Sequence, residues 1–417
     1  MTGFPQLTLR TLTEADTEAM HEFIDLVFVE QPTSPEVRAM DRDIQDLPAG
    51  RAVGVFDGDE VAGIGTLGSM TMTVPGGGTL PFAAVQFVGV SPVYRRRGVM
   101  TTMMRHHLHT LHETGAEPVA GLTASESVIY GRFGFGAATL SARFAIPRER
   151  SALRPVAGID EVRVRLVPSA ASVELSEPVL ARYVTRRAGA LARPDKWARA
   201  YAADPEQWRE GRSIVRTVIA ERDGETVGFA RYQNKAEGSA VGMPAGVTDV
   251  NEIFGDDTAA LAALIRYLVG IDLIATTKFY RQPADSPVIH LLEDFRASGM
   301  QVRDGLHLRL VDVDRALAGR TYSAPVDVVL DITDAFCPWN AGRWNLTGDE
   351  KSAQCVRTDA SADLALDVRD LAVAYLGGST LAALAQAAQV TELRPGALTY
   401  ASRAFATDLA PHLPWGI

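Results

Sequence analysis

Residues 88–108 read VGVSPVYRRRGVMTTMMRHHL, and this stretch decides the fold. A run rich in valine ends at Ser91-Pro92, three adjacent arginines and a glycine follow, and a helix begins inside the turn. The N-terminus of a helix carries unpaired backbone N–H groups and about half a positive charge. Phosphates bind at such a terminus, and arginines beside it add charge-assisted hydrogen bonds. The stretch therefore predicts a strand, a loop and a helix that together bind a pyrophosphate.

Three adjacent arginines on their own are more typical of a solvated surface. The strand before them and the helix after them favour the anion site instead. The chain contains no GxxxxGK[ST] motif, which excludes a Walker-type loop.

The composition limits the classes of protein and partner. With 417 residues, the chain is expected to form two or three domains. Its 51 acidic and 41 basic residues give a formal net charge of -10, which argues against a nucleic-acid binder and suits cationic small substrates. Cys337 and Cys355 lack a metal-ligand spacing, and no metal is expected. The N-terminal residues show no apolar signal core, so we expect a cytoplasmic protein.

An apolar run near the C-terminus approaches the length of a membrane span. Residues 371–390 read LAVAYLGGSTLAALAQAAQV, close to the roughly 20 residues that a membrane helix needs. The sequence GGST interrupts this run, and Ser379 or Thr380 is a favourable N-cap. We therefore expect two short helices of a soluble domain and no membrane association.

The N-terminal part of the chain has the pattern of a mixed α/β domain. Residues 51–74 alternate as a β-hairpin around Asp57-Gly58, a pair that tolerates positive φ in tight turns. Gly134 and Gly136 are expected to stop a short helix. The other expected elements are strands over residues 81–90 and 118–124 and helices over residues 14–28, 34–45, 97–114 and 125–135.

A second copy of this pattern follows. Residues 214–234 again place an Asp-Gly pair, Asp223-Gly224, between two β-rich runs, and residues 246–270 give a strand, a loop and a helix. The loop reads FGDD where the first copy has YRRRG, so we interpret the second copy as a duplicated fold without the anion-binding loop. A third region follows residue 283, with a strand-rich stretch from residue 305, several short strands and a last helix with an apolar tail.

The loop motif resembles that of a known superfamily. The pattern [RQ]-x-x-G-x-[GA] after a strand is similar to the acetyl-CoA loop of GNAT acetyltransferases. Residues 95–100, RRRGVM, match its first four positions, with Met100 in place of the usual small residue. Together with ASESVIYGRFGFG at residues 124–136, the degenerate second copy and the third region, the chain resembles the enhanced-intracellular-survival (Eis) acetyltransferases over nearly its whole length.

This resemblance implies an α/β fold of tandem GNAT-like domains, the second degenerate, followed by a sterol-carrier-protein-like domain. We place the GNAT domain at residues 1–150, the degenerate copy at 151–285 and the sterol-carrier-like domain at 286–417. It further implies a homo-hexamer that transfers acetyl groups from acetyl-CoA to amines of cationic small molecules such as aminoglycosides.

The resemblance also assigns the acetyl-CoA site. The backbone of a splayed strand at Val88, Gly89 and Val90 is expected to hold the pantetheine arm and the thioester. Ser125 and Glu126 are expected to cap a short helix, or Ser125 is expected to position the cofactor sulfur. The pyrophosphate is expected to lie on the loop formed by Arg95, Arg96, Arg97, Gly98, Val99 and Met100.

Two residues are expected to move protons. Tyr130 matches the catalytic tyrosine of the family, and a phenol with a reference pKa of about 10 suits a departing thiolate. From spacing alone, a core tyrosine beside Phe133 and Phe135 is the better interpretation, and the resemblance reverses it. The family's C-terminal carboxylate enters the active site as the base, and here it belongs to Ile417, acting through water. The alternative is a frayed terminus, against which Trp415 in the apolar tail argues.

Substrate contacts follow from the same resemblance. Phe28 and Glu30 align with a pocket aromatic and a pocket acid, and Phe87 matches another wall residue; for Glu30, a plain helix end is nearly as good an interpretation. A carboxylate against aromatic surface suits a cationic amine. Four histidines crowd one expected helix without an HExxH motif, which indicates a solvated face. These are His106, His107, His109 and His112, while Trp339 and Trp344 are expected in the third domain, as core or edge aromatics.

Two alternative functions remain open from the sequence. The acetyl acceptor could be a lysine side chain of a protein instead of a small molecule. In a different class of function, the third domain would hold a lipid and the GNAT copy would bind acyl-CoA without catalysis.

Overall fold

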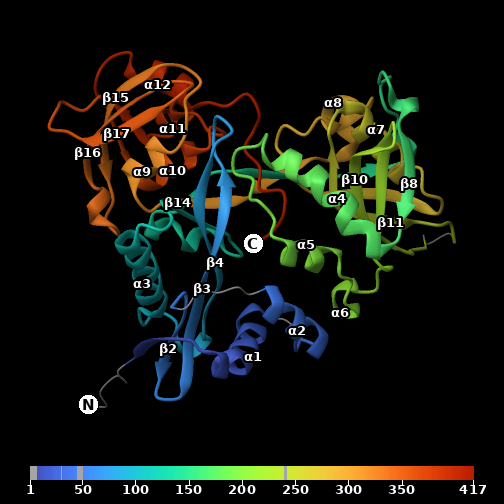
Figure 1. Ribbon diagram of the computed structural model, residues 1–417, viewed down its shortest axis with the longest axis horizontal. Helices are drawn as coiled ribbons and strands as arrows, with labels where there is room; N and C mark the ends of the chain where they lie inside the picture. The colour runs from blue at the N-terminus through green and yellow to red at the C-terminus, as the bar shows by residue number, and fades with distance from the viewer. Residues whose placement is uncertain (1–6, 30, 45–49, 239–241) are drawn as a thin grey trace. The chain divides into compact units, whose positions relative to one another are not determined.

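The computed structural model describes residues 7–29, 31–44, 50–238 and 242–417 (Figure 1). The chain divides into two compact units. The first unit holds Met1–Ala138, Leu306–Thr407 and Ile417, and the second holds Thr139–Gly305 and Asp408–Gly416. Within the described residues, the first unit contains two β-sheets and the second contains one.

A seven-stranded sheet and its helices form the N-terminal domain of the first unit. Helices α1 and α3 cover opposite faces of this sheet (Figure 1), because successive side chains of a strand point to opposite sides. Ile64 packs against Phe23 of α1, whereas a Cβ on Gly65 would lie 3.2 Å from His107 of α3. In spatial order the strands are β1 (Thr8–Thr11), β2 (Ala52–Asp57), β3 (Glu60–Thr73), β4 (Thr79–Val90), β5 (Val119–Thr123), β14 (Leu306–Leu310) and β6 (Gly136–Ala137); the helices are α1 (Thr17–Phe28), α2 (Pro35–Ile44) and α3 (Val99–Thr114).

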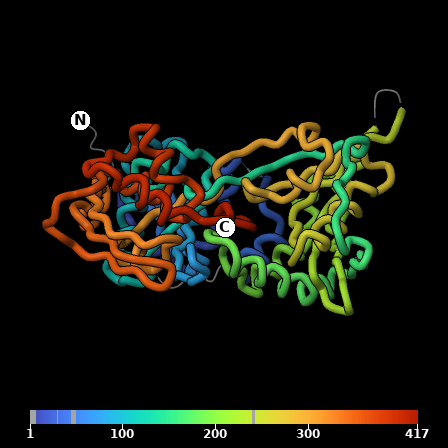
Figure 2. The backbone as a smooth tube through the Cα atoms, turned by 90° about the horizontal axis from the view of Figure 1, so that it is seen from above, coloured from blue at the N-terminus to red at the C-terminus, as the bar shows by residue number. Residues whose placement is uncertain are grey.

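Strand β14 completes this sheet from far along the chain. The sequence pattern placed residues 306–310 at the start of the third region, but the structure pairs them antiparallel with the whole of β5. All five residues of β14 are buried, as expected for a strand between two neighbours. Figure 2 shows the same arrangement, with orange late segments lying among the blue and teal early ones of the first unit. The sequence pattern of a strand does not show which sheet the strand joins.

Both expected hairpins form, with one difference in the turn. In the second copy, Arg222 pairs with Glu225, so Asp223-Gly224 occupies the two central positions, as predicted. In the first copy, Asp57 pairs with Glu60, and the central residues are instead Gly58-Asp59. Asp57 stays in the strand, where its carboxylate accepts a hydrogen bond from the Tyr94 hydroxyl.

A glycine pattern in β3 has a spacing known from nucleotide sites. Residues 63–68 read GIGTLG and match GxGxxG, which in dinucleotide-binding folds lies in the turn between a strand and a helix. Here all six residues lie inside β3, between β2 and β4. The pattern is therefore part of a strand and not a dinucleotide loop.

The second sheet of the first unit forms, with four helices, the C-terminal domain. The side chain of Thr380 accepts a hydrogen bond from the N–H of Ala383, which confirms the expected helix start inside the apolar run. Within the described residues, no helix combines the length and apolar character needed to cross a bilayer. In spatial order the strands are β17 (Ala353–Arg357), β16 (Gly342–Gly348), β15 (Val326–Thr333), β18 (Leu364–Asp367) and β19 (Val390–Glu392); the helices are α9 (Val313–Ala318), α10 (Val368–Tyr375), α11 (Leu381–Gln386) and α12 (Ala397–Phe405).

The second unit, here the middle domain, contains the second copy of the pattern. Its core packs α7 against the sheet through alanine and leucine side chains. In spatial order its strands are β13 (Gln301–Asp304), β7 (Leu140–Pro147), β12 (Ile274–Pro283), β11 (Gly246–Gly255), β10 (Glu225–Lys235), β9 (Arg216–Arg222) and β8 (Arg163–Val167). Its helices are α4 (Ser169–Val184), α5 (Asp195–Ala202), α6 (Glu206–Arg209), α7 (Thr258–Val269) and α8 (Val288–Leu291).

Candidate active site

Strands β4 and β5 run parallel and then separate. Their pairing covers Phe82–Ala84 of β4 and ends where Ala84 meets Gly121. Farther along, β4 carries a bulge: Gln86 pairs with Thr66 and Gly89 with Ile64, so that β4 has one extra residue. The extra residue lies at Phe87–Val88, where Phe87 adopts a left-handed φ of 51°. The resemblance predicted a splayed strand at this point, and no residue of β4 beyond Ala84 pairs with β5.

Helix α1 lies directly on the bulge. A Cβ on Gly89 would lie 2.6 Å from a methyl group of Val27, and Phe87 packs into the cluster formed by Phe23 and its neighbours. Phe28 is the last residue of α1, and 37% of its surface is exposed. The structure thus packs Phe87 against α1, leaves Phe28 partly exposed at the end of that helix, and does not describe the expected pocket acid Glu30.

The arginine loop presents an open helix N-terminus. Arg95, Arg96 and Arg97 are exposed, and Arg96 and Gly98 both have left-handed φ angles, 62° and 83°. Such alternation turns successive backbone N–H groups toward one point, a geometry that binds anions. Helix α3 begins at Val99, and its N-cap Gly98 offers no side chain to occupy the free N–H groups. The loop therefore has the features of a phosphate site.

Tyr94 fixes this loop to the first hairpin. Its hydroxyl lies 2.9 Å from Asp57 Oδ2 and 3.0 Å from Glu60 Oε2, and the Arg97 guanidinium lies over its ring. The hydrogen bond to Asp57, together with burial, raises the pKa of Tyr94 to about 12, so the phenol remains a donor. The sequence analysis did not single out Tyr94, although its place directly before the arginines was a usable signal.

The equivalent loop of the middle domain is closed. Helix α7 begins at Thr258, and the carboxylate of Asp257 accepts a hydrogen bond of 2.9 Å from the N–H of Ala260. Asp257 also forms an ion pair with Arg222, and Asp256 forms one with Arg182. A carboxylate of the chain itself thus occupies the position that a phosphate would take. The second copy lacks the anion-binding loop, as its FGDD sequence predicts.

Tyr130 lies in the loop that follows β5. The expected short helix is instead two 3₁₀ turns, Ser127–Ile129 and Gly131–Phe133, which end at Gly134 with φ of 82°. The Tyr130 ring is half-buried and meets Phe135 edge to face at 5.9 Å. Burial, with a smaller contribution from Glu126, raises the pKa of Tyr130 to about 12. The phenol therefore keeps its proton and is available to donate it.

Ser125 does not cap the first of these turns. The N-cap residue is Glu126, and neither turn starts with a side-chain hydrogen bond. The capping interpretation of Ser125 was wrong because the turn begins one residue later than expected. Ser125 is exposed at the end of β5, on the segment that leads to Tyr130.

The C-terminal carboxylate meets the end of β5. The Thr123 hydroxyl donates a hydrogen bond of 3.3 Å to a carboxylate oxygen of Ile417, which is half-buried. Thr123 is the last residue of β5, so Ile417 binds where the Tyr130 loop begins. The sequence analysis missed Thr123; the available signal was a polar residue at the carboxyl end of a buried strand, where ligands of open α/β sheets gather.

The preceding tail, Asp408–Gly416, belongs to the second unit and is ordered there. Trp415 is 1% exposed, and its indole N–H donates to the Leu191 carbonyl at 2.9 Å. The Tyr201 hydroxyl accepts from the Gly416 N–H at 2.8 Å and donates to its carbonyl at 3.1 Å. A frayed terminus, the alternative left open by the sequence, does not fit these contacts.

Comparisons with known proteins bear on this site. Family models described as acetyltransferase (GNAT) domains match residues 8–138 and 189–310, and one described as a sterol carrier protein domain matches residues 313–414. An uncharacterised N-acetyltransferase of Streptomyces avermitilis is 48% identical over 366 residues, covering 88% of this chain and 89% of that protein. N-acetyltransferase Eis of Mycobacterium tuberculosis is 32% identical over 378 residues, covering 87% of this chain and 88% of Eis.

The chain belongs to the Eis-type GNAT N-acetyltransferases. The crystal structure of Eis1 from Mycobacterium abscessus, 32% identical, superposes with a TM-score of 0.82 over 99% of this chain and 100% of that one. The predicted fold, two GNAT domains and a sterol-carrier-like domain, is confirmed, and so is the class of enzyme, an acyltransferase. GNAT acetyltransferases use acetyl-CoA as co-substrate, and the open N-terminus of α3 in this Eis-type chain fits such a group.

The sequence of this Eis-type chain predicted that the histidines of α3 lie on a solvated face of the helix, and the structure does not agree. His107 is 1% exposed under the β4 bulge, and burial lowers its pKa to about 3. His112 stacks on Trp339 of the C-terminal domain at 4.2 Å, and His109 meets the same ring edge-on. The expectation failed because α3 is covered on two sides. In the described part of the chain, no three or more His, Cys, Asp and Glu side chains are grouped so as to hold a metal ion.

Proposed function

We propose that this chain transfers the acetyl group of acetyl-CoA to an amine of a cationic small molecule, such as an aminoglycoside. The observation that carries the proposal is the open start of α3, with its exposed arginines and uncapped N–H groups, beside the separation of β4 from β5. In the middle domain the same position is closed by Asp257. Only the N-terminal domain thus combines an anion loop with a splayed strand in the described residues.

The arginine loop and the bulged part of β4 would bind different parts of acetyl-CoA. The N–H groups of residues 96–100 and the side chains of Arg95 and Arg96 would hold the diphosphate. Backbone groups of Val88, Gly89 and Val90, which do not pair with β5, would hold the pantetheine arm, and Ser125 would lie near the sulfur. When bound, acetyl-CoA supplies the acetyl thioester; binding energy from the distant diphosphate then serves to align its reactive end.

Tyr130 is proposed as the general acid. Its pKa, raised to about 12 by burial, keeps the phenol protonated at any physiological pH, so that it can donate to the departing sulfur. The Ile417 carboxylate, held by Thr123, is proposed as the base that receives the amine proton through a water molecule. A carboxylate with a pKa of about 3.5 is a weak base for an ammonium near 10, so the relay works best on an amine of lowered pKa. Amines with cationic neighbours have this property.

The acceptor is proposed to be cationic for two reasons. The chain carries a net charge of -10, which draws cations. Phe87 lies at the bulge and Phe28 at the end of α1, and aromatic faces attract ammonium groups. A lysine side chain of a protein shares this chemistry and forms the comparison arm of the test.

The proposal is tested by thiol release. The full chain is incubated with acetyl-CoA and, in turn, with aminoglycosides, polyamines and lysine peptides, while free thiol is measured and products are weighed by mass spectrometry. We expect turnover with multiply charged small amines and acetylation of the amine nitrogen. Binding of CoA without thiol release in the presence of any amine would overturn the enzymatic reading. Turnover confined to peptides would replace the small molecule by a protein acceptor.

The arginine loop gives a prediction about affinity. Exchange of Arg95 and Arg96 for glutamate is expected to weaken CoA binding about 30-fold or more, since two charge-assisted hydrogen bonds are lost and two repulsions gained. Titration calorimetry at low and high salt measures the loss, which should shrink as salt rises. Arg105, exposed farther along α3, is the matched control for each single exchange, Arg95→Glu and Arg96→Glu. Equal losses for Arg105→Glu would mean that general charge, and not the loop, binds CoA.

A further inference from the structure

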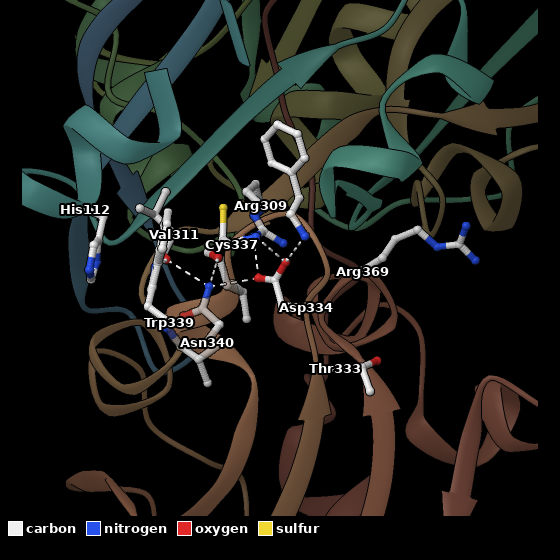
Figure 3. A network of polar contacts seen from close by, with 12 residues as sticks. His112, Arg309, Val311, Thr333, Asp334, Cys337, Trp339, Asn340 and Arg369 are labelled. Atoms are coloured by element: carbon white, nitrogen blue, oxygen red, sulfur yellow. Dashed lines mark hydrogen bonds and ion pairs between the residues drawn. The ribbon is translucent and has the colours of Figure 1, made fainter. Parts of the chain in front are cut away.

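A buried ion pair joins the C-terminal domain to the first sheet behind the Tyr130 loop. Arg309 of β14 is fully buried and forms an ion pair with Asp334, which follows β15 (Figure 3). The Asp334 carboxylate also accepts hydrogen bonds from the backbone N–H of Cys337 at 2.9 Å and of Phe336 at 3.2 Å, and from the side-chain amide of Asn340 at 3.0 Å. The carboxylate is therefore held in one position by four donors.

Asn340 ties the same loop to the end of β14. Its amide donates to the Val311 carbonyl at 3.0 Å, and its side-chain oxygen accepts from the Val313 N–H at 3.0 Å. The Trp339 indole N–H donates to the Val311 carbonyl at 2.9 Å. Figure 3 shows the Asn340 amide to the left of the Asp334 carboxylate and the Arg309 guanidinium above it. These hydrogen bonds fix the Asp334 carboxylate, and the carboxylate in turn holds the Arg309 guanidinium in place.

The Arg309 guanidinium packs closely against the loop that carries Tyr130. A Cβ added to Gly134 would overlap Nη1 of Arg309, so only a glycine permits this approach. Gly134 closes the 3₁₀ turn after Tyr130: its N–H donates to the Gly131 carbonyl at 3.0 Å, and the Phe133 N–H donates to the Tyr130 carbonyl at 3.0 Å. The left-handed φ of Gly134 and the contact with Arg309 together fix the direction in which this turn leaves Tyr130.

Helix α10 of the C-terminal domain supports the same loop. A Cβ on Gly131 would lie 3.4 Å from the Arg369 side chain, and one on Gly134 would lie 3.0 Å from Val368. A Cβ on Gly136 would overlap the Arg369 carbonyl oxygen. The loop therefore contacts α10 with bare backbone at three places, an arrangement that leaves it little freedom to move.

We propose that Arg309 is a positioning residue for Tyr130. Its ion pair with Asp334 holds the guanidinium against Gly134, and the fixed turn sets the direction of the loop that carries the phenol. A purely stabilising role explains the pair poorly, because apolar pairs of similar volume commonly stabilise a core at least as well as a buried ion pair. In this interpretation the C-terminal domain forms the rear wall of the active site. The inference rests on the proposed role of Tyr130 as general acid.

The test separates position from stability. The double variant Arg309→Met/Asp334→Leu removes both charges, so that neither partner is left buried alone. The N–H groups of Cys337 and Phe336 lose their acceptor, so we expect a lower melting temperature in a protein that still folds. We expect CoA affinity within about twofold, and kcat lowered about tenfold or more through misplacement of the acid. In a Tyr130→Phe background, the same double change is expected to lower kcat by less than about twofold, since coupled residues are not additive.

Two further variants serve as a control and as a fallback for this test. Arg51 and Glu117 form another mostly buried ion pair in the N-terminal domain, at the opposite end of β5. Arg51→Met/Glu117→Leu applies the same exchange there, and kcat should stay within about twofold of the unchanged protein. Arg309→Lys keeps the charge but not the planar group, and should lower kcat with little change in the KM for acetyl-CoA. This variant provides the answer if the double variant does not fold.

Three results would overturn the inference. The first is full kcat in the folded Arg309→Met/Asp334→Leu variant, or in Arg309→Lys if the double variant does not fold. The second is a loss of kcat from the double change that is as large in the Tyr130→Phe background as in the unchanged protein, and the third is an equal loss of kcat in Arg51→Met/Glu117→Leu. A normal kcat for Tyr130→Phe alone would instead overturn the proposed general acid. The two failures are therefore distinguishable.

Discussion

Replacement of Tyr130 by phenylalanine is expected to lower kcat by about 100-fold or more, the usual contribution of a general acid. The phenylalanine ring keeps the edge-to-face contact with Phe135 and the fit of the loop, so folding should be unaffected. The affinity for CoA should change by less than about twofold, because the arginine loop proposed to bind the diphosphate is a separate segment. Steady-state kinetics and calorimetry on the same preparation measure both quantities.

The pH dependence provides the control for this assignment. An acid works in its protonated form, and with its pKa raised to about 12, Tyr130 loses its proton only as pH rises through that value. We therefore expect kcat/KM to rise with pH as the acceptor amine is deprotonated, without a falling limb below about pH 10. Tyr130→Phe should follow the same rising curve at a lower level. A falling limb near neutral pH that vanishes in Tyr130→Phe would contradict the raised pKa.

The local parts of the site could be predicted from the sequence. The strand through Val88, the arginine loop and α3 follow from valine-rich periodicity, a glycine and a helix start, which all lie within a short window. The hairpin at Asp223-Gly224 and the helix cap at Thr380 follow from turn and cap chemistry in the same way. In each case neighbouring residues determine the structure, and no distant partner is needed.

The parts that depend on distant partners could not be predicted. Residues 306–310 were recognised as a strand, but their place beside β5 is a choice among sheets that periodicity does not make. His112 was expected in solvent because its stacking on Trp339 joins residues far apart in the chain. The contact of Arg309 with Gly134 is of the same kind: neither residue signals the other, and only the folded backbone shows that they meet.

Removal of Ile417 is expected to lower kcat/KM about 30-fold or more, as loss of a general base does. The deletion withdraws the carboxylate that Thr123 holds at the end of β5 and shifts the new terminus back by about 3.8 Å. The cofactor loop is untouched, so CoA affinity should change by less than about twofold. Thiol release measured against acceptor concentration, together with calorimetry, gives both values.

Two further variants separate the carboxylate from the side chain of Ile417. Ile417→Ala keeps the terminal carboxylate within reach of Thr123 and should lose far less activity than the deletion. Thr123→Val removes the hydroxyl that donates to this carboxylate and should show an intermediate loss, larger at low pH, where a poorly held carboxylate is more readily protonated. If the deletion and Ile417→Ala were equally impaired, the apolar side chain would be the functional part. The base would then have to be sought among other groups near the end of β5.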